Sequence, residues 1–246
     1  MALREEFEKT GSWLFRWRSY LPLLLTGIML LGMQHFEYPG HCHAWDQLWE
    51  IVCLVISFFG LGIRIYTVGH TPRGTSGRNT HSQKAEVLNT TGIYSIVRHP
   101  LYLGNFFIWL GISMFVHMWW ISLIFILIFW LYYERIMFAE EEFLRKKFGK
   151  EYEKWSSKTS AFLPRFNDWR PPDLPFSLKN VLKREYTGLF AIVASFTFLE
   201  IAGDIFAEGK LELDLMWIII FSAGLVIYLT LRTLKKKTKI LLVEGR

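Results

Sequence analysis

Two stretches decide the fold: residues 88–104 read LNTTGIYSIVRHPLYLG, and residues 139–149 read AEEEFLRKKFG. The residues between them, 101–138, are almost all apolar, and the apolar run is interrupted near residues 117–120. A bilayer core of about 30 Å needs about 20 apolar residues per crossing. The pattern therefore predicts two membrane helices joined by a tight turn, with Arg98, His99 and Glu140 to Glu142 at the same membrane face.

The whole chain has the composition of a membrane protein. Of its 246 residues, 52% are hydrophobic and 20% are charged, which excludes a disordered chain. Apolar windows at 21–36, 48–68, 101–117, 119–138, 187–206 and 215–231 predict six spans. The expected fold is an all-α integral membrane protein with about six transmembrane helices and a binding site at the cytoplasmic face.

Three segments are expected along the chain. Residues 1–20 mix basic and aromatic side chains and suggest an interfacial segment, although a plain cytoplasmic flank explains them as well. Residues 21–170 hold four spans and the polar stretches, and residues 171–246 hold a linker, two additional spans and a basic tail. No small-residue cleavage site follows the first apolar run, so we expect this span to be retained.

The distribution of positive charge indicates the orientation. The net charge is +6, but the loops at 34–47, 117–119 and 207–214 contain a single basic residue, Lys210. This asymmetry follows the positive-inside rule and predicts that both termini are cytoplasmic. The basic surface is then expected to contact the bilayer rather than nucleic acid.

Neither the cysteines nor the outer histidines indicate a metal site. His35, His41, Cys42 and His43 lie in one short loop, but a metal site needs three or four ligands that converge at defined spacing. The only other cysteine, Cys53, lies inside a predicted span, where burial as a small apolar side chain is expected. We therefore expect no metal and no disulfide framework.

The polar loop after the second span is a candidate anion site. Its sequence, residues 71–84, is TPRGTSGRNTHSQK, and it combines Arg73 and Arg78 with hydroxyl groups, Asn79 and Gln83. A guanidinium binds the oxygens of a phosphate or a carboxylate bidentately. A solvated basic loop without a ligand is the alternative.

The start of the third span offers a second anion site. Pro100 suits the first helical position, and the residue before a proline, His99, is expected just outside the helix. The N–H groups of Leu101 to Leu103 would then lack partners within the helix and could hold a carboxylate or a phosphate. Gly104 would leave one face of the helix open to a ligand or to another helix.

The acidic triplet stands out on a basic membrane face. Pairs four residues apart, Glu141 with Arg145 and Glu142 with Lys146, account for two of the acids. Glu140 has no basic residue four positions on, so it is the expected ligand-facing acid.

These stretches together resemble a known family. LNTTGIYSIVRHPLYLG, followed about forty residues later by EE-x-x-L-x-x-x-FG-x-x-Y, is similar to the membrane methyltransferases that include isoprenylcysteine carboxyl methyltransferase and the phospholipid N-methyltransferases. The resemblance covers roughly residues 79–166 and implies an S-adenosylmethionine-dependent methyltransferase that acts on a membrane lipid. The oligomeric state stays open.

The resemblance implies roles for individual residues. Arg98, His99 and Glu140 are the implied catalytic residues. The implied cofactor-binding set is Glu86, Val87, Leu88, Asn89, Tyr94, His99, Pro100, Leu101, Tyr102, Gly104, Glu140 and Glu141. The implied acceptor-binding set is Arg73, Arg78, Asn79, Gln83 and Arg135.

The acceptor is expected to be an anionic lipid. The 71–84 loop also resembles that of bacterial relatives that methylate lipid A phosphate, which implies a bacterial inner membrane. A phosphate is already anionic near neutral pH and needs no general base, and no base-plus-nucleophile arrangement is evident. Prenylcysteine and aminophospholipid acceptors remain as rivals.

Two other classes of function remain open. Sterol reductases share an RHP-x-Y-x-G element and bind NADPH, but this chain has Leu101 where those enzymes usually have asparagine. A membrane scaffold without enzymatic activity is the other alternative.

Overall fold

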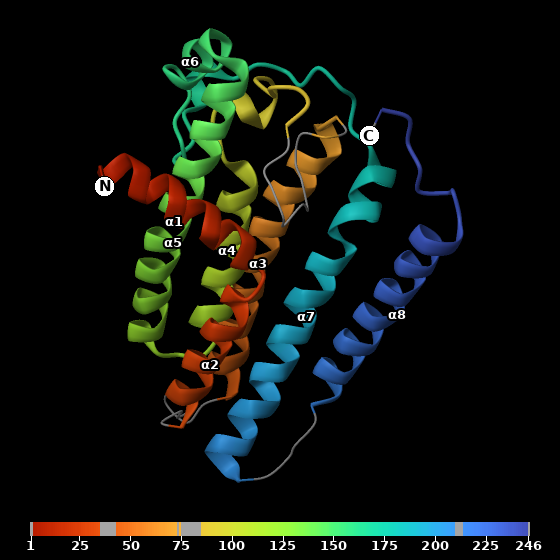
Figure 1. The fold of residues 1–246 in the computed structure, drawn as a ribbon. Helices are drawn as coiled ribbons and strands as arrows, with labels where there is room; N and C mark the ends of the chain where they lie inside the picture. Colours follow the sequence, from red (N-terminus) through yellow and green to blue (C-terminus); the bar gives the residue numbers. More distant parts are fainter. Residues whose placement is uncertain (1, 35–42, 73, 75–84, 210–213, 246) are drawn as a thin grey trace.

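The computed structural model describes residues 2–34, 43–72, 74, 85–209 and 214–245. These residues form a bundle of long helices with short connecting segments (Figure 1). In chain order the elements are α1 (Leu3–Trp17), α2 (Leu21–Met33), α3 (His43–His70), η2 (Ile93–Ser95), α4 (Pro100–Met114), α5 (Trp119–Phe148), α6 (Lys150–Ser156), η3 (Phe166–Asp168), α7 (Leu178–Glu208) and α8 (Leu215–Lys237).

The all-α prediction is confirmed, and four described helices are long and apolar enough to cross a membrane. They are Gln47–His70, Trp119–Phe148, Leu178–Phe206 and Leu215–Lys237. The apolar parts of α2 and α4, Leu24–Met33 and Pro100–Met114, are shorter. Hence the chain has the helices of an integral membrane protein, while the crossing of all six predicted spans stays a prediction.

The sequence explains where several helices begin and end. Pro100 occupies the first position of α4, and Ser177 caps α7 by accepting a hydrogen bond from the Asn180 N–H. Gly149 separates α5 from α6 with a φ of 53°, a conformation that glycine adopts without the steric cost of a Cβ. The tight turn expected between α4 and α5 is present, and His117 has a φ of 59° there.

Helices α3 and α4 pack with their backbones close together. A Cβ atom added to Gly60 would lie 2.5 Å from the carbonyl oxygen of Gly104, and one added to Gly111 would lie 2.4 Å from that of Cys53. The Ser57 hydroxyl donates to the Ile108 carbonyl across the same interface at 2.8 Å. Small residues at such a contact let two membrane helices approach closely.

Helix α1 crosses the bundle at an angle, near the end that also holds α6 and both termini (Figure 1). Gly11 faces the backbone of Arg135 in α5, because an added Cβ would lie 2.0 Å from that carbonyl oxygen. The rings of Phe7 and Phe138 meet edge to face at 5.8 Å, and the Tyr132 hydroxyl donates to the Leu14 carbonyl at 2.8 Å. These contacts fix α1 to α5, and Trp13 and Trp17 remain exposed, as suits an interfacial helix.

The C-terminal pair α7 and α8 stands beside α3 (Figure 1). Phe196 of α7 stacks on Trp217 of α8 with ring centroids 6.3 Å apart, and Phe115 at the end of α4 contacts Phe196 edge to face. The sequence places the start of this span at residue 187, but the helix begins at Leu178. The earlier start brings Glu185 into the helix, where it pairs with Arg64 of α3.

Candidate functional site

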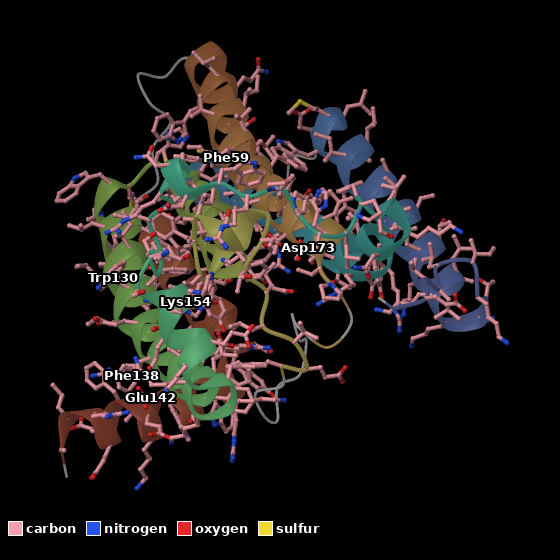
Figure 2. All side chains as sticks on the ribbon, turned by 90° about the horizontal axis from the view of Figure 1, so that it is seen from above. Phe59, Trp130, Phe138, Glu142, Lys154 and Asp173 are labelled. Atoms are coloured by element: carbon pink, nitrogen blue, oxygen red, sulfur yellow. The ribbon has the colours of Figure 1, made fainter. Side chains whose placement is uncertain are left out.

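The ends of α3 and α5 and the starts of α4 and α7 lie at one end of the bundle (Figure 1). Viewed from that end, Phe138 and Glu142 of α5 lie beside α1, and Asp173 lies toward α7 (Figure 2). Five polar side chains, from the segment just before α4, the first turn of α4 and the end of α5, form a connected group. We call it the acid–histidine cluster: Arg98, His99, Tyr102, Glu140 and Glu141.

Hydrogen bonds and ion pairs connect all five members of the acid–histidine cluster. The His99 Nε2 atom lies 3.0 Å from Glu141 Oε1, and its Nδ1 atom lies 3.6 Å from Glu140 Oε2. The Tyr102 hydroxyl donates to Glu140 at 2.8 Å, and the Arg98 Nε lies 3.0 Å from Glu141. The predicted meeting of the arginine–histidine pair with the acidic triplet is thus confirmed.

His99 is held as an extended residue just before α4, with a φ of −120°. This is the conformation expected for a residue that precedes proline. Its ring is buried and stacks on Tyr102, with centroids 5.6 Å apart. Burial alone would lower the pKa of His99, but hydrogen bonds and charges from Glu140 and Glu141 outweigh it, so the pKa is raised.

The N–H groups at the start of α4 differ from the expectation. The Tyr102 and Leu103 N–H groups both donate to the His99 carbonyl, at 3.1 Å each. Of the three N–H groups predicted to be unpaired, only that of Leu101 has no acceptor among the described residues. The prediction was wrong for the other two because the extended His99 directs its carbonyl back over the first turn.

The three acids of the triplet have different partners, which their spacing in the sequence does not predict. Glu142 is 3% exposed and pairs with Arg4 of α1 and with Arg145, both at 2.5 Å. Lys146 pairs with Glu8 instead. The predicted pairs Glu141–Arg145 and Glu142–Lys146 are therefore wrong, because α1 lies over this part of α5 and offers partners from outside the helix.

Residues after α5 fix the position of the arginine–histidine segment. The Arg98 and His99 N–H groups donate to the carbonyls of Ser160 and Ala161, at 2.9 and 3.2 Å. The Arg98 Nη1 donates to the Ser156 carbonyl at 2.8 Å, and the Trp155 indole donates to the Tyr94 carbonyl at 3.0 Å. The segment is thus held by backbone and side-chain bonds independent of the acids.

The other implied cofactor residues lie around the cluster. Glu86 and Val87 are exposed, and Leu88 and Asn89 are half-buried. The Lys147 ammonium contacts the Ala85 carbonyl, which places this segment beside the end of α5. Gly104 has a neighbour from another helix, because an added Cβ would lie 2.6 Å from Arg64 Cγ.

Most of the expected acceptor residues lie outside the described part of the chain. Arg73, Arg78, Asn79 and Gln83 lie outside the described residues, as do His35, His41 and Cys42 of the outer loop. Arg135 lies over the Phe7 ring of α1 at 5.2 Å rather than in the acid–histidine cluster. No group of three His, Cys, Asp or Glu side chains that could hold a metal occurs among the described residues.

One polar group beside the cluster was missed. Arg64 of α3, Asn105 of α4 and Glu185 of α7 are joined by hydrogen bonds of 2.7 to 3.0 Å. Ionisable side chains within apolar spans usually face the bundle interior and mark functional positions. Arg64 lies inside a predicted span, so its position carries this signal. Glu185 does not, because that span was expected to begin at residue 187.

Related proteins are found both among family models and among individual sequences. Residues 49–151 match the family model described as phospholipid methyltransferase. The chain is 30% identical over 159 residues to the nickel-cobalt-cadmium resistance protein NccN of Alcaligenes xylosoxydans xylosoxydans, covering 65% of this chain and 70% of that protein. It is 27% identical over 193 residues to the cobalt-zinc-cadmium resistance protein CzcN of Cupriavidus metallidurans, covering 76% and 82%.

A eukaryotic enzyme shares the central part of the chain. The protein-S-isoprenylcysteine O-methyltransferase of Schizosaccharomyces pombe is 39% identical over 82 residues, which are 33% of this chain and 34% of that enzyme. No solved structure shows a significant match. The matches, together with the helices long enough to cross a membrane, decide in favour of a methyltransferase among the classes left open by the sequence. The chain belongs to the family of membrane methyltransferases that includes the phospholipid methyltransferases and the protein-S-isoprenylcysteine O-methyltransferases.

Proposed function

We propose that this protein transfers a methyl group from S-adenosylmethionine to an anionic lipid headgroup at the cytoplasmic face of a bacterial inner membrane. The observation that carries the proposal is the acid–histidine cluster, which joins the start of α4 to the end of α5. It lies within residues 49–151, the part that matches the family model. Residues 21–170 are proposed as the methyltransferase core with four crossings. For the whole chain we propose six crossings and cytoplasmic termini.

The chemistry of the cluster fits S-adenosylmethionine. This molecule carries an ammonium group, a sulfonium, ribose hydroxyls and a carboxylate, and when bound it supplies the methyl group in electrophilic form. The Glu140 and Glu141 side chains are 25% and 17% exposed, so their carboxylates can accept bonds from hydroxyl or ammonium groups. The Leu101 N–H can donate to a carboxylate at the helix start.

The remaining members of the implied site would orient the bound molecule. Tyr102 holds Glu140 through its hydroxyl, and Arg98 and His99 hold Glu141. Tyr94 and the 86–89 segment lie along the same end of the bundle and are proposed to cover the nucleoside. Aromatic rings bind cationic groups favourably, which suits a sulfonium.

Positioning is the main task of the protein in such a reaction. Transfer requires the acceptor oxygen to lie in line with the methyl carbon and the sulfur, and correct placement alone lowers the barrier substantially. The Glu140 and Glu141 carboxylates are already engaged by Tyr102, His99 and Arg98. An acceptor that is already anionic needs no proton removed, so it agrees with this arrangement.

A lipid phosphate, such as a lipid A phosphate, is the acceptor we favour. The two bacterial relatives are named for resistance to divalent metals. Methylation of an anionic lipid oxygen removes a negative charge that would otherwise bind such a cation. The similarity to protein-S-isoprenylcysteine O-methyltransferase supports a lipid-linked carboxylate as the second candidate.

Transfer of a labelled methyl group tests the proposal. The full chain is purified in detergent and incubated with S-adenosylmethionine labelled in the methyl group and with total lipids from a Gram-negative bacterium. We expect label in an anionic lipid and none with a Glu140→Gln variant, while Glu134→Gln, an exposed change on the same helix, keeps activity. Label in a zwitterionic or amino lipid alone would refute the anionic acceptor, and no label in any lipid would refute the function.

A further inference from the structure

A polar group links the C-terminal helix α7 to the core. The Arg64 guanidinium donates from Nε and Nη2 to the two carboxylate oxygens of Glu185, at 2.8 and 3.0 Å. Its Nη1 donates to the Asn105 side-chain oxygen at 2.7 Å. Arg64 is 19% exposed and Glu185 5%, so the pair is mostly removed from solvent. Three helices, α3, α4 and α7, thus meet at one guanidinium.

The group lies about two helical turns inside the ends of its three helices, near the site. Arg64 precedes the end of α3 by six residues, Asn105 follows the start of α4 by five, and Glu185 follows the start of α7 by seven. A rise of 1.5 Å per residue places all three about 8–10 Å below the helix ends. That is the depth of a lipid headgroup that has entered between helices from the side.

The guanidinium retains unused donors. Arginine has five N–H groups, and three of those on Arg64 form the bonds to Glu185 and Asn105. The two others, one on each Nη, have no acceptor among the described residues. Two such donors suit the oxygens of a phosphate or a carboxylate.

The group also faces the proposed methyl-donor site. Burial raises the pKa of the Tyr94 phenol, the positive charges of Arg184 and Arg64 oppose the rise, and the negative charge of Glu140 adds to it. Arg64, Arg184 and Glu140 therefore act on the same phenol. The Arg64 side chain also packs against Gly104 in the second turn of α4, since a Cβ added to Gly104 would lie 2.6 Å from Arg64 Cγ. A headgroup held at Arg64 would lie beside the acid–histidine cluster.

We propose that α7 completes the acceptor site: Glu185 is a positioning residue that holds Arg64 beside Asn105, and Arg64 binds the anionic headgroup through its two remaining N–H groups. The proposal rests on the proposed function and names the residues that recognise its acceptor. It also gives the C-terminal pair of helices a role that the family core, residues 49–151, does not contain.

The segment before α7 sets the register of Glu185. The His70 Nδ1 lies 2.9 Å from the Leu174 carbonyl oxygen, and the Ser177 N–H donates to the Gly69 carbonyl at 2.9 Å. The Asn180 amide donates to the Val68 carbonyl at 2.8 Å. Because these bonds tie the start of α7 to the end of α3, Glu185 meets Arg64 two helical turns further down.

The test measures lipid and methyl-donor binding separately. Full-length protein in phosphatidylcholine nanodiscs containing phosphatidic acid is analysed by native mass spectrometry for retained phosphatidic acid, and by calorimetry for affinity toward S-adenosylmethionine. The variants are Arg64→Gln and Glu185→Gln. Arg232→Gln, on the exposed side of α8, is the matched control, and inorganic phosphate is added as a competitor to separate a lipid headgroup from free phosphate.

We expect both variants to retain about tenfold less phosphatidic acid than the control, with affinity for S-adenosylmethionine unchanged within about twofold. Inorganic phosphate should compete only weakly, since it lacks the acyl chains. Retention equal to the control in Arg64→Gln would overturn the proposal, and so would competition by phosphate that is as strong as competition by added lipid. The proposed function fails separately, if no lipid receives labelled methyl.

A charge exchange distinguishes positioning from simple stabilisation. The double variant Arg64→Glu with Glu185→Arg keeps an ion pair between α3 and α7 but moves the cation to α7. We expect it to recover thermal stability relative to Glu185→Gln without recovering phosphatidic-acid retention. Recovery of both would mean that the pair only stabilises the bundle, which would overturn the role of Glu185. If these changes prevent folding, Arg64→Lys, which keeps a positive charge beside Glu185 but loses the guanidinium fork, decides the question: retention of phosphatidic acid equal to the control would overturn the proposal.

Discussion

Replacement of Gly60 by alanine tests whether the close contact of α3 and α4 supports the site. The new Cβ would lie 2.5 Å from the Gly104 carbonyl oxygen and 2.7 Å from the Ile108 nitrogen. Both are backbone atoms that cannot rotate away. The two helices must therefore move apart by roughly 0.5–1 Å before the contact becomes ordinary.

The expected loss of stability combines two opposing effects. Overpacking of a close contact costs about 1–3 kcal/mol, and alanine in place of glycine returns up to about 1 kcal/mol of helix propensity. The free energy of unfolding should fall by about 1–2 kcal/mol, which corresponds to a Tm lower by about 2–8 °C. Arg64 lies one turn after Gly60, so the 2.7 Å bond from Arg64 to Asn105 should lengthen as well.

Thermal unfolding of the detergent-solubilised protein, followed by tryptophan fluorescence, measures the effect. Gly62→Ala is the matched control, because nothing lies within 4 Å of a Cβ at that position and only the gain in helix propensity remains. The control should melt at the wild-type temperature or slightly above it. Equal Tm values for Gly60→Ala and Gly62→Ala would refute the claim that backbone contact holds α3 against α4.

Three further predictions concern the ends of α4 and α5. Glu140→Gln should weaken binding of S-adenosylmethionine about tenfold in calorimetry, because a charged hydrogen bond is lost, whereas Glu134→Gln should bind as the wild type does; equal affinities would contradict the proposed role of Glu140. Glu142→Gln should accelerate limited proteolysis within α1, because it weakens the ion pair with Arg4. Its affinity for S-adenosylmethionine should stay within about twofold of the wild type. Unchanged cleavage would show that this ion pair does not hold α1. Because the pKa of His99 is raised in the folded protein, its contribution to stability is complete below about pH 6.5 and is lost as the pH rises through the higher, folded-state pKa. A pH series of Tm values should show this loss in the wild type and not in His99→Gln; a wild-type Tm that rises with pH over that range relative to the variant would contradict it.

The arrangement of the hairpin could be predicted from the sequence because its signals are local. The apolar lengths, the proline at the start of α4 and the turn near His117 place His99 and Glu141 at the same end without reference to any other helix. The 3.0 Å contact between these two side chains follows from that placement.

The partners of individual charges could not be predicted, because they come from segments distant in the chain. Glu142 takes Arg4, which lies 138 residues away, so spacing along one helix assigned it the wrong partner. Arg135 points to Phe7 because α1 crosses this face of α5, and no periodicity within residues 119–138 indicates that crossing. The start of α7 could not be predicted for the same reason. The apolar window excluded Glu185, although its charge is matched by Arg64 from a distant helix.

The pairing of Arg64 with Glu185 has a consequence for how the protein enters the bilayer. Arg64 is synthesised 121 residues before Glu185, so the ribosome delivers the cation long before its counterion. An unmatched arginine within a span is costly during insertion, by about 2.5–3.5 kcal/mol at the centre of the bilayer and less toward the ends, where Arg64 lies. Until α7 is synthesised, Asn105 is the only one of the described hydrogen-bond partners of Arg64 that can offset that cost. A ribosome that stalls between α3 and α7 would leave a nascent chain in which the charge of Arg64 is unmatched, and quality-control proteases can recognise such a charge.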